Sequence, residues 1–326
     1  MLGRMLIATL LAHLAAVGAP IPLIIDTDAG SDDLMAISFL LTRADVHVEA
    51  ITIANGLAHV RAGGANVLRL LALAGRSDVA VYLGSETPLQ KTADFPAEWR
   101  KIADELPGVK LPPPKRSLEQ EPAATFLARR LSQSPGATVL ALGPLTNIAM
   151  AFRAAPSAPK KVHRMVIMGG AFRVPGNLGD GGLFKTDNKA AEWNIFADPE
   201  AARVVFQSGV KIDLVPLDAT SKVPIDWAWV EDFRRAVTTP LGRFIVQVLE
   251  SDRVAIEGGF FQAWDPLAAV ALVHRDVVMF RPLKVEVRDN GRTAEAGAGP
   301  SIQAGLDAHG GVFRDLFLAA FRQVLK

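Results

Sequence analysis

The chain has 326 residues, of which 50% are hydrophobic and 21% are charged, and its net charge is +1. This composition is that of a globular protein with a large core, and the length suits one big α/β domain or two modest ones. The near-neutral charge argues against a nucleic-acid partner, and the absence of cysteine excludes disulfides, thiol catalysis and thiolate metal sites.

The N-terminal segment differs from the rest of the chain. Arg4 precedes an apolar stretch from Met5 to Val17, and small residues follow up to Ala19. The stretch is too short to span a bilayer comfortably and has no stop-transfer flank. We therefore expect a secretory signal peptide over residues 1–19, with cleavage after Ala19. The mature protein would then be secreted or periplasmic, with no membrane association; an N-terminal membrane anchor is the alternative.

Short apolar runs alternate with amphipathic helical patterns through the first two thirds of the remaining chain. The predicted strands are 23–26, 46–54, 79–83, 137–142, 162–168 and 210–217. The predicted helices between them are 32–42, 62–74, 122–132, 144–154 and 199–207. Continuous apolar strands that alternate with helices indicate an α/β fold, with an open, mostly parallel sheet flanked by helices.

The last third of the chain is first helical and then rich in strands. Helices are predicted near 226–236, 240–256 and 264–274, strands near 283–287 and 292–298, and a last amphipathic helix toward residue 326. Two long stretches, 84–120 and 172–190, look irregular, and such loops in compact domains are commonly lids or binding loops. No repeat or break in composition demands a second domain, so we predict a single domain over residues 20–326.

The densest polar motif directly follows the first predicted strand. It places four aspartates within eight residues, namely Asp26, Asp28, Asp32 and Asp33. Sheets of this kind bind ligands outside the carboxyl ends of their strands. Four carboxylates so close repel one another, and no Lys or Arg lies nearby in sequence, so a bound hard cation is the favoured explanation. A helix cap at Asp32 with surplus surface charge is the alternative.

Further polar groups follow later strands or begin later helices. The carbonyl of Leu142 lies near a strand end, where a calcium ion could use it. Glu192 and Asn194 alternate with apolar neighbours, so an extended segment would put both on one face, suited to holding sugar hydroxyls. Asp265 opens a predicted helix and, taken alone, is most simply a cap, and Asp198 looks like an ordinary N-cap.

Taken together, these motifs resemble the nucleoside hydrolases, the inosine–uridine preferring family of N-ribohydrolases. The resemblance runs from about residue 23 to the C-terminus, and Ala29 stands where many members have proline. A lone Asp-x-Asp would be weak support, but further motifs occur in the family's order. The matching segments are 26–33, 143–147, 168–170, 175–177, 191–194, 198–201 and 265–266.

The resemblance implies a Rossmann-like nucleoside hydrolase fold and calcium-dependent hydrolysis of the N-glycosidic bond of ribonucleosides, giving ribose and a free base. The implied calcium ligands are Asp28, Asp33, the backbone carbonyl of Leu142 and Asp265, and Asp28 would also be the general base toward the attacking water. The substrate contacts would be Asp32, Asn177 or Asn188, Glu192, Asn194 and, as a stacking group for the base, Trp264. Relatives form dimers or tetramers, so a homo-oligomer is expected.

Trp264 departs from the family pattern. Many members have a histidine at this position, which protonates the departing base, whereas tryptophan can stack on a base but cannot usefully donate a proton. The acid for the leaving group must therefore come from another residue, from solvent or from the substrate itself. The departure keeps open a second hypothesis, a secreted calcium-dependent riboside-binding protein with little or no turnover. A phosphotransferase of the haloacid dehalogenase type is a remote third, because the later motifs find no place in it.

Overall fold

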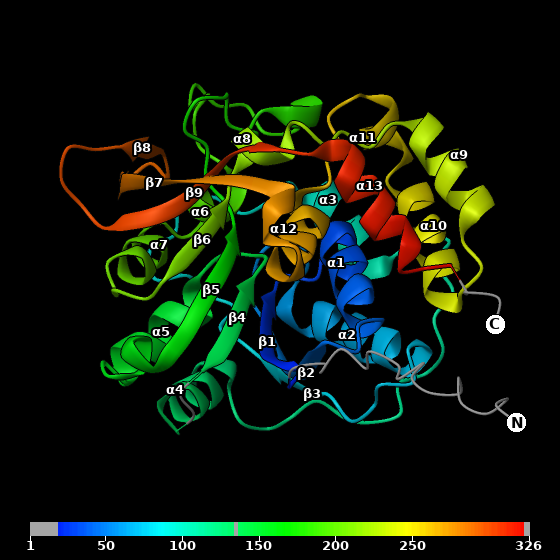
Figure 1. The fold of residues 1–326 in the computed structure, drawn as a ribbon, viewed down its shortest axis with the longest axis horizontal. Coiled ribbons are helices and arrows are strands. Elements are labelled where there is room, and N and C mark those ends of the chain that lie inside the picture. Colours follow the sequence, from blue (N-terminus) through cyan, green and yellow to red (C-terminus); the bar gives the residue numbers. More distant parts are fainter. Residues whose placement is uncertain (1–18, 134–135, 323–326) are drawn as a thin grey trace, which may run out of the picture.

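The computed structural model describes residues 19–133 and 136–322 (Figure 1). The predicted signal peptide therefore lies outside the described residues except for Ala19. Strands of the described chain form one mixed sheet, and their bounds are β1 (Ile21–Thr27), β2 (Val46–Ile53), β3 (Ala80–Leu83), β4 (Ala137–Ala141), β5 (Val162–Met168), β6 (Ile212–Val215), β7 (Val278–Val287), β8 (Thr293–Glu295) and β9 (Ser301–Ala308). Their order is β3-β2-β1-β4-β5-β6-β9-β7-β8.

The predicted α/β architecture with a mostly parallel sheet is confirmed. Every neighbouring pair from β3 to β9 is parallel, and β7 runs antiparallel to both β9 and β8. Parallel strands need crossover connections, and helices supply them here, as the alternating sequence pattern predicts. The carboxyl ends of β1, β4 and β5 therefore meet at the same edge of the sheet.

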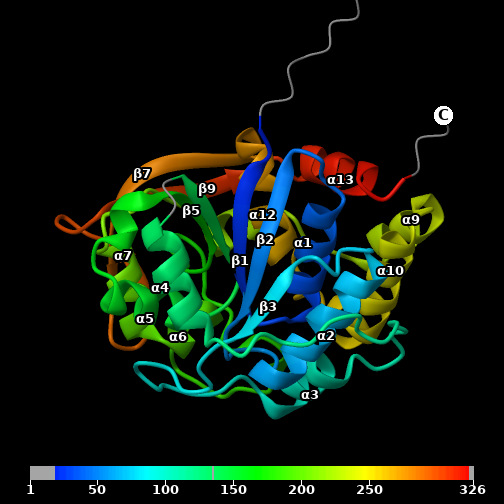
Figure 2. The same ribbon diagram turned by 90° about the horizontal axis from the view of Figure 1, so that it is seen from below.

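Two helical layers cover the sheet because successive apolar residues of each strand face opposite sides. Leu23 and Ile25 of β1 pack into one hydrophobic cluster, and Ile24 between them packs into the other. Figure 2 shows the two layers on either side of the strands. One layer contains α1 (Ser31–Leu41), α2 (Val60–Leu73), α10 (Pro240–Ser251), α12 (Trp264–Val273) and α13 (Gly310–Ala319), and the other contains α4 (Ala123–Gln133), α5 (Thr146–Ala154) and α7 (Pro199–Phe206).

Shorter helices complete the fold, and several begin at side-chain caps. Asp198 accepts from the Ala201 N–H at the start of α7, as predicted, and Asp226 accepts from the Trp229 N–H. The remaining helices are α3 (Ala97–Glu105), α6 (Trp193–Ala197), α8 (Leu217–Thr220), α9 (Trp227–Ala236), α11 (Arg253–Glu257) and the 3-10 turns η1 (Ala158–Lys161), η2 (Asp180–Gly182) and η3 (Arg275–Val277).

The C-terminal third differs from the prediction in three places. Residues 301–308, for which no strand was predicted, form β9 inside the sheet, and the helix that follows is α13. The single helix expected over 240–256 is divided at Asp252 into α10 and α11. Strand β7 begins at Val278, five residues before the predicted strand 283–287. Helices α3, α6 and α8 have no predicted counterpart, and the remaining predicted elements agree with the observed ones to within a few residues.

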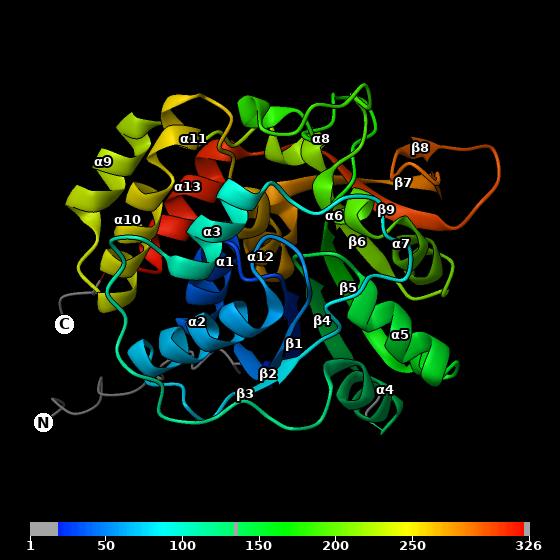
Figure 3. The same cartoon turned by 180° about the vertical axis from the view of Figure 1, so that it is seen from behind.

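The irregular stretch 84–120 contains one helix, α3, which packs against α2 (Figure 3). Asn66 of α2 donates hydrogen bonds to the carbonyls of Ala103 and Asp104 at 3.1 Å each. These bonds hold α3 over the carboxyl-end side of the sheet. Within residues 19–133 and 136–322, none of the helices is long and apolar enough to cross a membrane.

Candidate active site

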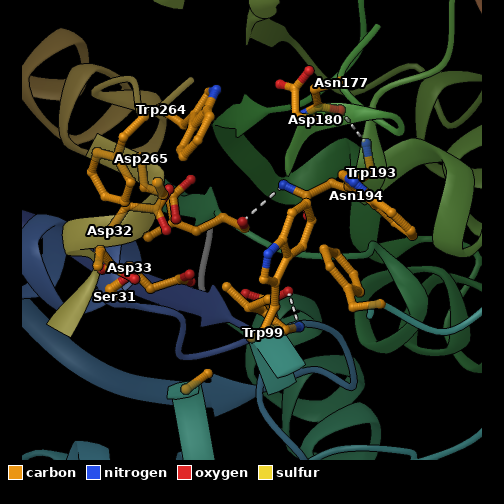
Figure 4. Close-up of a pocket in the computed structure, with 18 of the residues that line it drawn as sticks. Ser31, Asp32, Asp33, Trp99, Asn177, Asp180, Trp193, Asn194, Trp264 and Asp265 are labelled. Carbon is orange, nitrogen blue, oxygen red and sulfur yellow. Dashed lines mark hydrogen bonds between the residues drawn. The ribbon is translucent and has the colours of Figure 1, made fainter. Parts of the chain in front are cut away.

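A pocket lies where the carboxyl ends of β1, β4 and β5 meet, at the edge that the sequence predicts (Figure 4). Asp28 follows β1, Leu142 follows β4, and Asp265 is in the first turn of α12. All the predicted site residues except Asn188 line this pocket. The fold therefore gathers side chains that are more than two hundred positions apart in sequence.

Backbone and hydroxyl hydrogen bonds hold the turn between β1 and α1 in place. Ala29 has φ 57°, a left-handed conformation that costs a residue with a side chain on the order of 1 kcal/mol. Its N–H donates to Thr27 Oγ1 at 3.1 Å, and the Gly30 N–H donates to Asp33 Oδ2 at 3.0 Å. The Thr27 hydroxyl also donates to Asp33. These bonds offset the strain and fix the Asp33 carboxylate at the start of α1.

Asp28 is buried and closely surrounded by backbone. Its Oδ2 accepts a hydrogen bond from the Leu57 N–H at 2.7 Å. A Cβ atom added at Gly56 would lie 2.0 Å from Asp28 Oδ2, and one added at Gly143 would lie 2.9 Å from Asp28 Cβ. Both glycines are therefore required for the present position of the Asp28 side chain.

Asp26, the first aspartate of the cluster, has a separate structural role. It does not line the pocket; its Oδ1 accepts from Thr52 Oγ1 at 2.5 Å and from Asn147 Nδ2 at 2.9 Å. These bonds tie β1 to β2 and to the start of α5. Burial raises the pKa of Asp26 to about 7, against the opposing effect of both hydrogen bonds.

Three carboxylates of the pocket are suited to hold a cation together. Asp32, Asp33 and Asp265 are buried, and each offers an oxygen within 4.8 Å of the others. Asp265 Oδ1 is buried and accepts no hydrogen bond from any described residue. Because an unpaired buried oxygen is costly, a ligand from outside the chain is expected there. The donors are all oxygens, which hard divalent cations prefer, so these residues fit a metal ion.

The electrostatics of the pocket support the same conclusion. Burial raises the pKa of Asp33 and of Asp265 well above the usual range, and repulsion between neighbouring carboxylates adds to the rise. Burial also raises the pKa of Asp32 to about 7, again with a contribution from Asp28. For Asp28 itself burial raises the pKa, while hydrogen bonds and the positive charge of Arg100 oppose the rise. A bound cation would relieve this repulsion.

The carbonyl of Leu142 is held by Asn194. The Asn194 side chain donates from Nδ2 to the Leu142 carbonyl at 2.9 Å and to the Met168 carbonyl at 3.3 Å. A carbonyl oxygen has two lone pairs, so Leu142 retains capacity for a second partner. The bonds span the ends of β4 and β5 and leave Asn194 Oδ1 as an acceptor toward the pocket region.

The prediction that Glu192 and Asn194 lie on an extended segment is wrong. Glu192 is the N-cap of α6 and accepts from the N–H groups of Asn194 at 2.8 Å and Ile195 at 3.2 Å, while Asn194 is inside the helix. Glu192 also accepts from the Gly170 N–H at 2.8 Å. The chain turns into a helix here because the Glu192 carboxylate satisfies its free N–H groups. Both side chains nevertheless line the pocket, and burial raises the pKa of Glu192 to about 7.

Of the two asparagines left as alternatives by the sequence, only Asn177 lines the pocket. Its Oδ1 accepts from the Trp193 N–H at 3.1 Å, and Figure 4 shows it beside Asp180, across the pocket from Asp265. Asn188 instead organises its own loop: its Nδ2 donates to the Asn290 carbonyl at 2.8 Å, and its Oδ1 accepts from the Ala191 N–H at 3.2 Å. These bonds keep Asn188 away from the pocket.

Aromatic side chains form an apolar wall of the pocket. Trp264 packs against Phe261 with ring centroids 5.2 Å apart, and both line the pocket. Trp193 is buried and stacks on Phe95 with centroids 4.6 Å apart, and it meets Trp99 of α3 edge-on. Such surfaces suit a flat aromatic ring, as a nucleobase presents.

Three polar residues of the lining were not predicted. Ser31 was overlooked within the aspartate motif, Asp180 lies in the irregular stretch 172–190, and Asp252 was assigned to a continuous helix. Asp180 is partly buried, and this burial raises its pKa. No pattern in the sequence marks Asp252, because only the break between α10 and α11 brings it to the pocket.

Comparison with known proteins supports the family that the sequence motifs resemble. Residues 23–310 match the model of the inosine-uridine preferring nucleoside hydrolase family. The chain belongs to this family. It is 34% identical over 274 residues to the probable uridine nucleosidase 1 of Oryza sativa subsp. japonica, which covers 82% of each chain. It is 36% identical over 231 residues to the pyrimidine-specific ribonucleoside hydrolase RihA of Salmonella arizonae, covering 71% of this chain and 70% of that one.

Solved structures of nucleoside hydrolases share the fold. A plant nucleoside hydrolase superposes with a TM-score of 0.80 at 28% identity, covering 94% of this chain and 100% of the other. As a nucleoside hydrolase, the protein is an N-glycosyl hydrolase that converts ribonucleosides to ribose and a base. The family is metal-dependent, and the cluster of Asp32, Asp33 and Asp265 could bind the metal.

Proposed function

We propose that the metal of this nucleoside hydrolase is calcium and that Asp28 activates the attacking water. The calcium ligands would be Asp28, Asp33, the Leu142 carbonyl and Asp265. All four donors are oxygens, and calcium accepts six to eight oxygen ligands in flexible geometry, so water and substrate hydroxyls can complete the shell. The observation that carries this proposal is the buried Asp265 Oδ1, which accepts no hydrogen bond from any described residue. Asp265 also lies next to two further carboxylates, those of Asp32 and Asp33.

In this proposal the carboxylates of the pocket bind the sugar, and the aromatic wall binds the base. The cation, when bound, lowers the pKa of a coordinated water and orients the ribose diol. Asp28 takes the proton of the attacking water as general base, and its Oδ2 is steadied by the Leu57 N–H. Water attacks C1′ from the face opposite the base, so the configuration inverts, as in inverting glycosidases. The stacked base would lie along the wall that contains Trp264.

The remaining polar side chains would hold the sugar. Asp32 and Asn194 Oδ1 are acceptors for ribose hydroxyls, since the Asn194 amide nitrogen is already engaged with two carbonyls. The Asn177 oxygen accepts from Trp193, and its amide N–H₂, which donates to no other described residue, would donate toward the 5′-hydroxyl. Glu192 would bind a sugar hydroxyl and, through its cap on α6, keep Asn194 in position.

A nucleoside panel tests this proposal. Purified protein is incubated with uridine, cytidine, inosine and adenosine, and the release of reducing sugar is measured. Uridine is tested first, because uridine and pyrimidine ribonucleosides appear in the names of the sequence relatives. We expect EDTA to abolish turnover and added calcium to restore it better than magnesium. Binding of nucleosides without any sugar release would instead support the riboside-binding alternative, which the tryptophan at position 264 motivates.

We also propose that the mature protein is exported, with signal cleavage after Ala19, and that it forms a homo-oligomer. The apolar stretch behind Arg4 supports export, and the dimers and tetramers known in the family support association. N-terminal sequencing of the protein from the periplasm or medium tests the cleavage, and light scattering after gel filtration tests the oligomer. An uncleaved N-terminus in the cytoplasmic fraction, or a monomer at all concentrations, would contradict the respective proposal.

A further inference from the structure

Departure of a nucleobase leaves an electron pair on its nitrogen, and a nearby acid that protonates it speeds the reaction. Trp264 cannot serve as this acid. Among the described residues that line the pocket there is no histidine. His59, which follows the pocket residue Leu57 by two positions, is exposed, and its Nδ1 lies 2.6 Å from Asp104 Oδ2, away from the lining. The titratable side chains among the described residues that line the pocket are carboxyl groups, so a protein acid for the leaving group would be one of these.

Asp252 is a carboxyl group that the calcium site and the sugar contacts do not use. It lies at the break between α10 and α11 and lines the pocket. The Ser31 hydroxyl lies near its carboxyl group and acts to lower the pKa of Asp252. Its Oδ2 is buried, and no residue of the described chain forms a hydrogen bond with it. A buried carboxyl oxygen without a partner points to one supplied by a ligand.

The neighbours of Asp252 belong to both the carboxylate half and the apolar half of the pocket. On one side, its neighbour Ser31 directly precedes Asp32 and Asp33 of the carboxylate cluster. On the other side, Ala255 of the following turn lines the apolar wall together with Phe261 and Trp264. With ribose on the carboxylates and the base along the apolar wall, the glycosidic bond lies at this boundary. In this arrangement Asp252 would lie near the bond that breaks.

The surroundings of Asp252 favour its neutral form. Burial raises its pKa to about 7, and the nearby Ser31 hydroxyl only partly opposes the rise. The adjacent Arg253 does not neutralise it, because its guanidinium bonds to Glu257 and lies over the Trp227 ring. The titratable groups that share the pocket with Asp252 are all acidic: Asp28, Asp32, Asp33, Asp180, Glu192 and Asp265.

We propose that Asp252 is the catalytic acid that protonates the departing base, in place of the histidine that position 264 lacks. This inference rests on the proposed function and adds a residue to it. The water oxygen forms its bond to C1′ and gives a proton to Asp28, while the bond from C1′ to the base nitrogen breaks. The electron pair of that bond goes to the base, which takes a proton from Asp252. Asp28 then loses its proton to solvent and Asp252 regains one, so nucleoside and water give ribose and neutral base.

Asp252→Asn tests this assignment, because it keeps the size of the side chain but removes the transferable proton. The unmodified protein and the variant are compared on the nucleoside hydrolysed fastest and on 4-nitrophenyl riboside, whose phenolate leaves without protonation. We expect kcat for the nucleoside to fall by at least about 100-fold and kcat for 4-nitrophenyl riboside to change by less than about threefold. Glu250→Gln, on the exposed face of α10 where Glu250 pairs with Arg234, is the matched control and should leave both rates unchanged.

Two results would overturn the assignment of Asp252. Nucleoside turnover within about threefold of the unmodified protein would show that no proton comes from this residue. An equal loss on both substrates would show that Asp252 supports the sugar site or the fold instead. If the unmodified protein hydrolyses neither riboside, the proposed function is wrong, and the assignment of Asp252 is wrong with it. The rate of the unmodified protein therefore distinguishes a failure of the proposed function from a failure of the Asp252 assignment.

Discussion

Gly56→Ala is expected to inactivate the enzyme without unfolding it, although the substitution adds a single methyl group. The added Cβ would lie 2.0 Å from Asp28 Oδ2 and 2.7 Å from both Asp28 Cβ and Cγ. Real Cβ contacts essentially never fall below 3.0 Å, so the Asp28 carboxyl must move by roughly 1 Å, the difference between these two distances. The backbone at Gly56 does not have a left-handed φ, so alanine itself is tolerated there.

The size of the effect follows from that displacement. A misplacement of about 1 Å in a catalytic group costs on the order of 100-fold in rate, which corresponds to about 2.7 kcal/mol of transition-state stabilisation. Overpacking of this kind destabilises a fold by about 1 to 3 kcal/mol, which a domain of this size can tolerate. We therefore expect kcat to fall by about two orders of magnitude, with a melting temperature only a few degrees lower.

The assay is ribose release under saturating nucleoside, with the unfolding temperature measured in parallel. Gly297→Ala is the matched control, because an added Cβ there meets no atom within 4 Å and the rate should not change. Combining Gly56→Ala with Asp28→Asn should lower the rate no further than Asp28→Asn alone, since both act on the same carboxyl. Gly56→Ala with full activity and a native fold would refute the placement of Asp28, and an additive loss would refute its role as the target.

The remaining predictions concern the general base, the cation and proton uptake. Asp28→Asn should keep the fold, as judged by circular dichroism, but lower kcat by at least about 100-fold; wild-type turnover would exclude Asp28 as the base. Asp33→Ala should weaken calcium binding by more than about tenfold in calorimetric titration, and unchanged metal content after chelation and dialysis would contradict this. Burial raises the pKa of Asp32 and Glu192 to about 7, so the folded protein binds protons that the unfolded chain releases between about pH 4 and 7. In EDTA its melting temperature should therefore fall as pH rises through this window, and calcium should reverse the fall near pH 8; a melting temperature that rises with pH in EDTA would contradict the reasoning.

The sheet was predictable because its strands are continuous apolar runs separated by helical periodicity. Strand β9 was missed because residues 301–308 contain Gly305 and two alanines, with Ile302 as the one β-branched residue. This strand is stabilised by pairing with β7 and β6, and such pairing between distant segments cannot be predicted from the strand propensity of its own residues. The break at Asp252 was not predicted because the apolar periodicity of α10 continues into α11.

The gathering of the site was predictable from one topological rule, that parallel strands place their carboxyl ends at a common edge. The rule accounts for Asp28 and Leu142, which follow β1 and β4 and which the fold brings to one pocket. The rule does not predict residues that come to the pocket through packing between helices, such as Asp252. Nor does it distinguish an extended Glu192 from a helix cap, because that choice depends on the free N–H groups that the carboxylate meets.

The large separation in sequence between Asp33 and Asp265 also has a consequence for synthesis of the chain. Asp33 is made early, whereas Asp265 emerges from the ribosome only after six strands of the sheet and most of the helices. A truncated product that stops before α12 would keep the aspartate-rich turn but lack the carboxylate that completes it. Cation affinity can therefore serve as a readout of full-length, correctly folded protein, distinguishing it from fragments that retain the whole N-terminal motif.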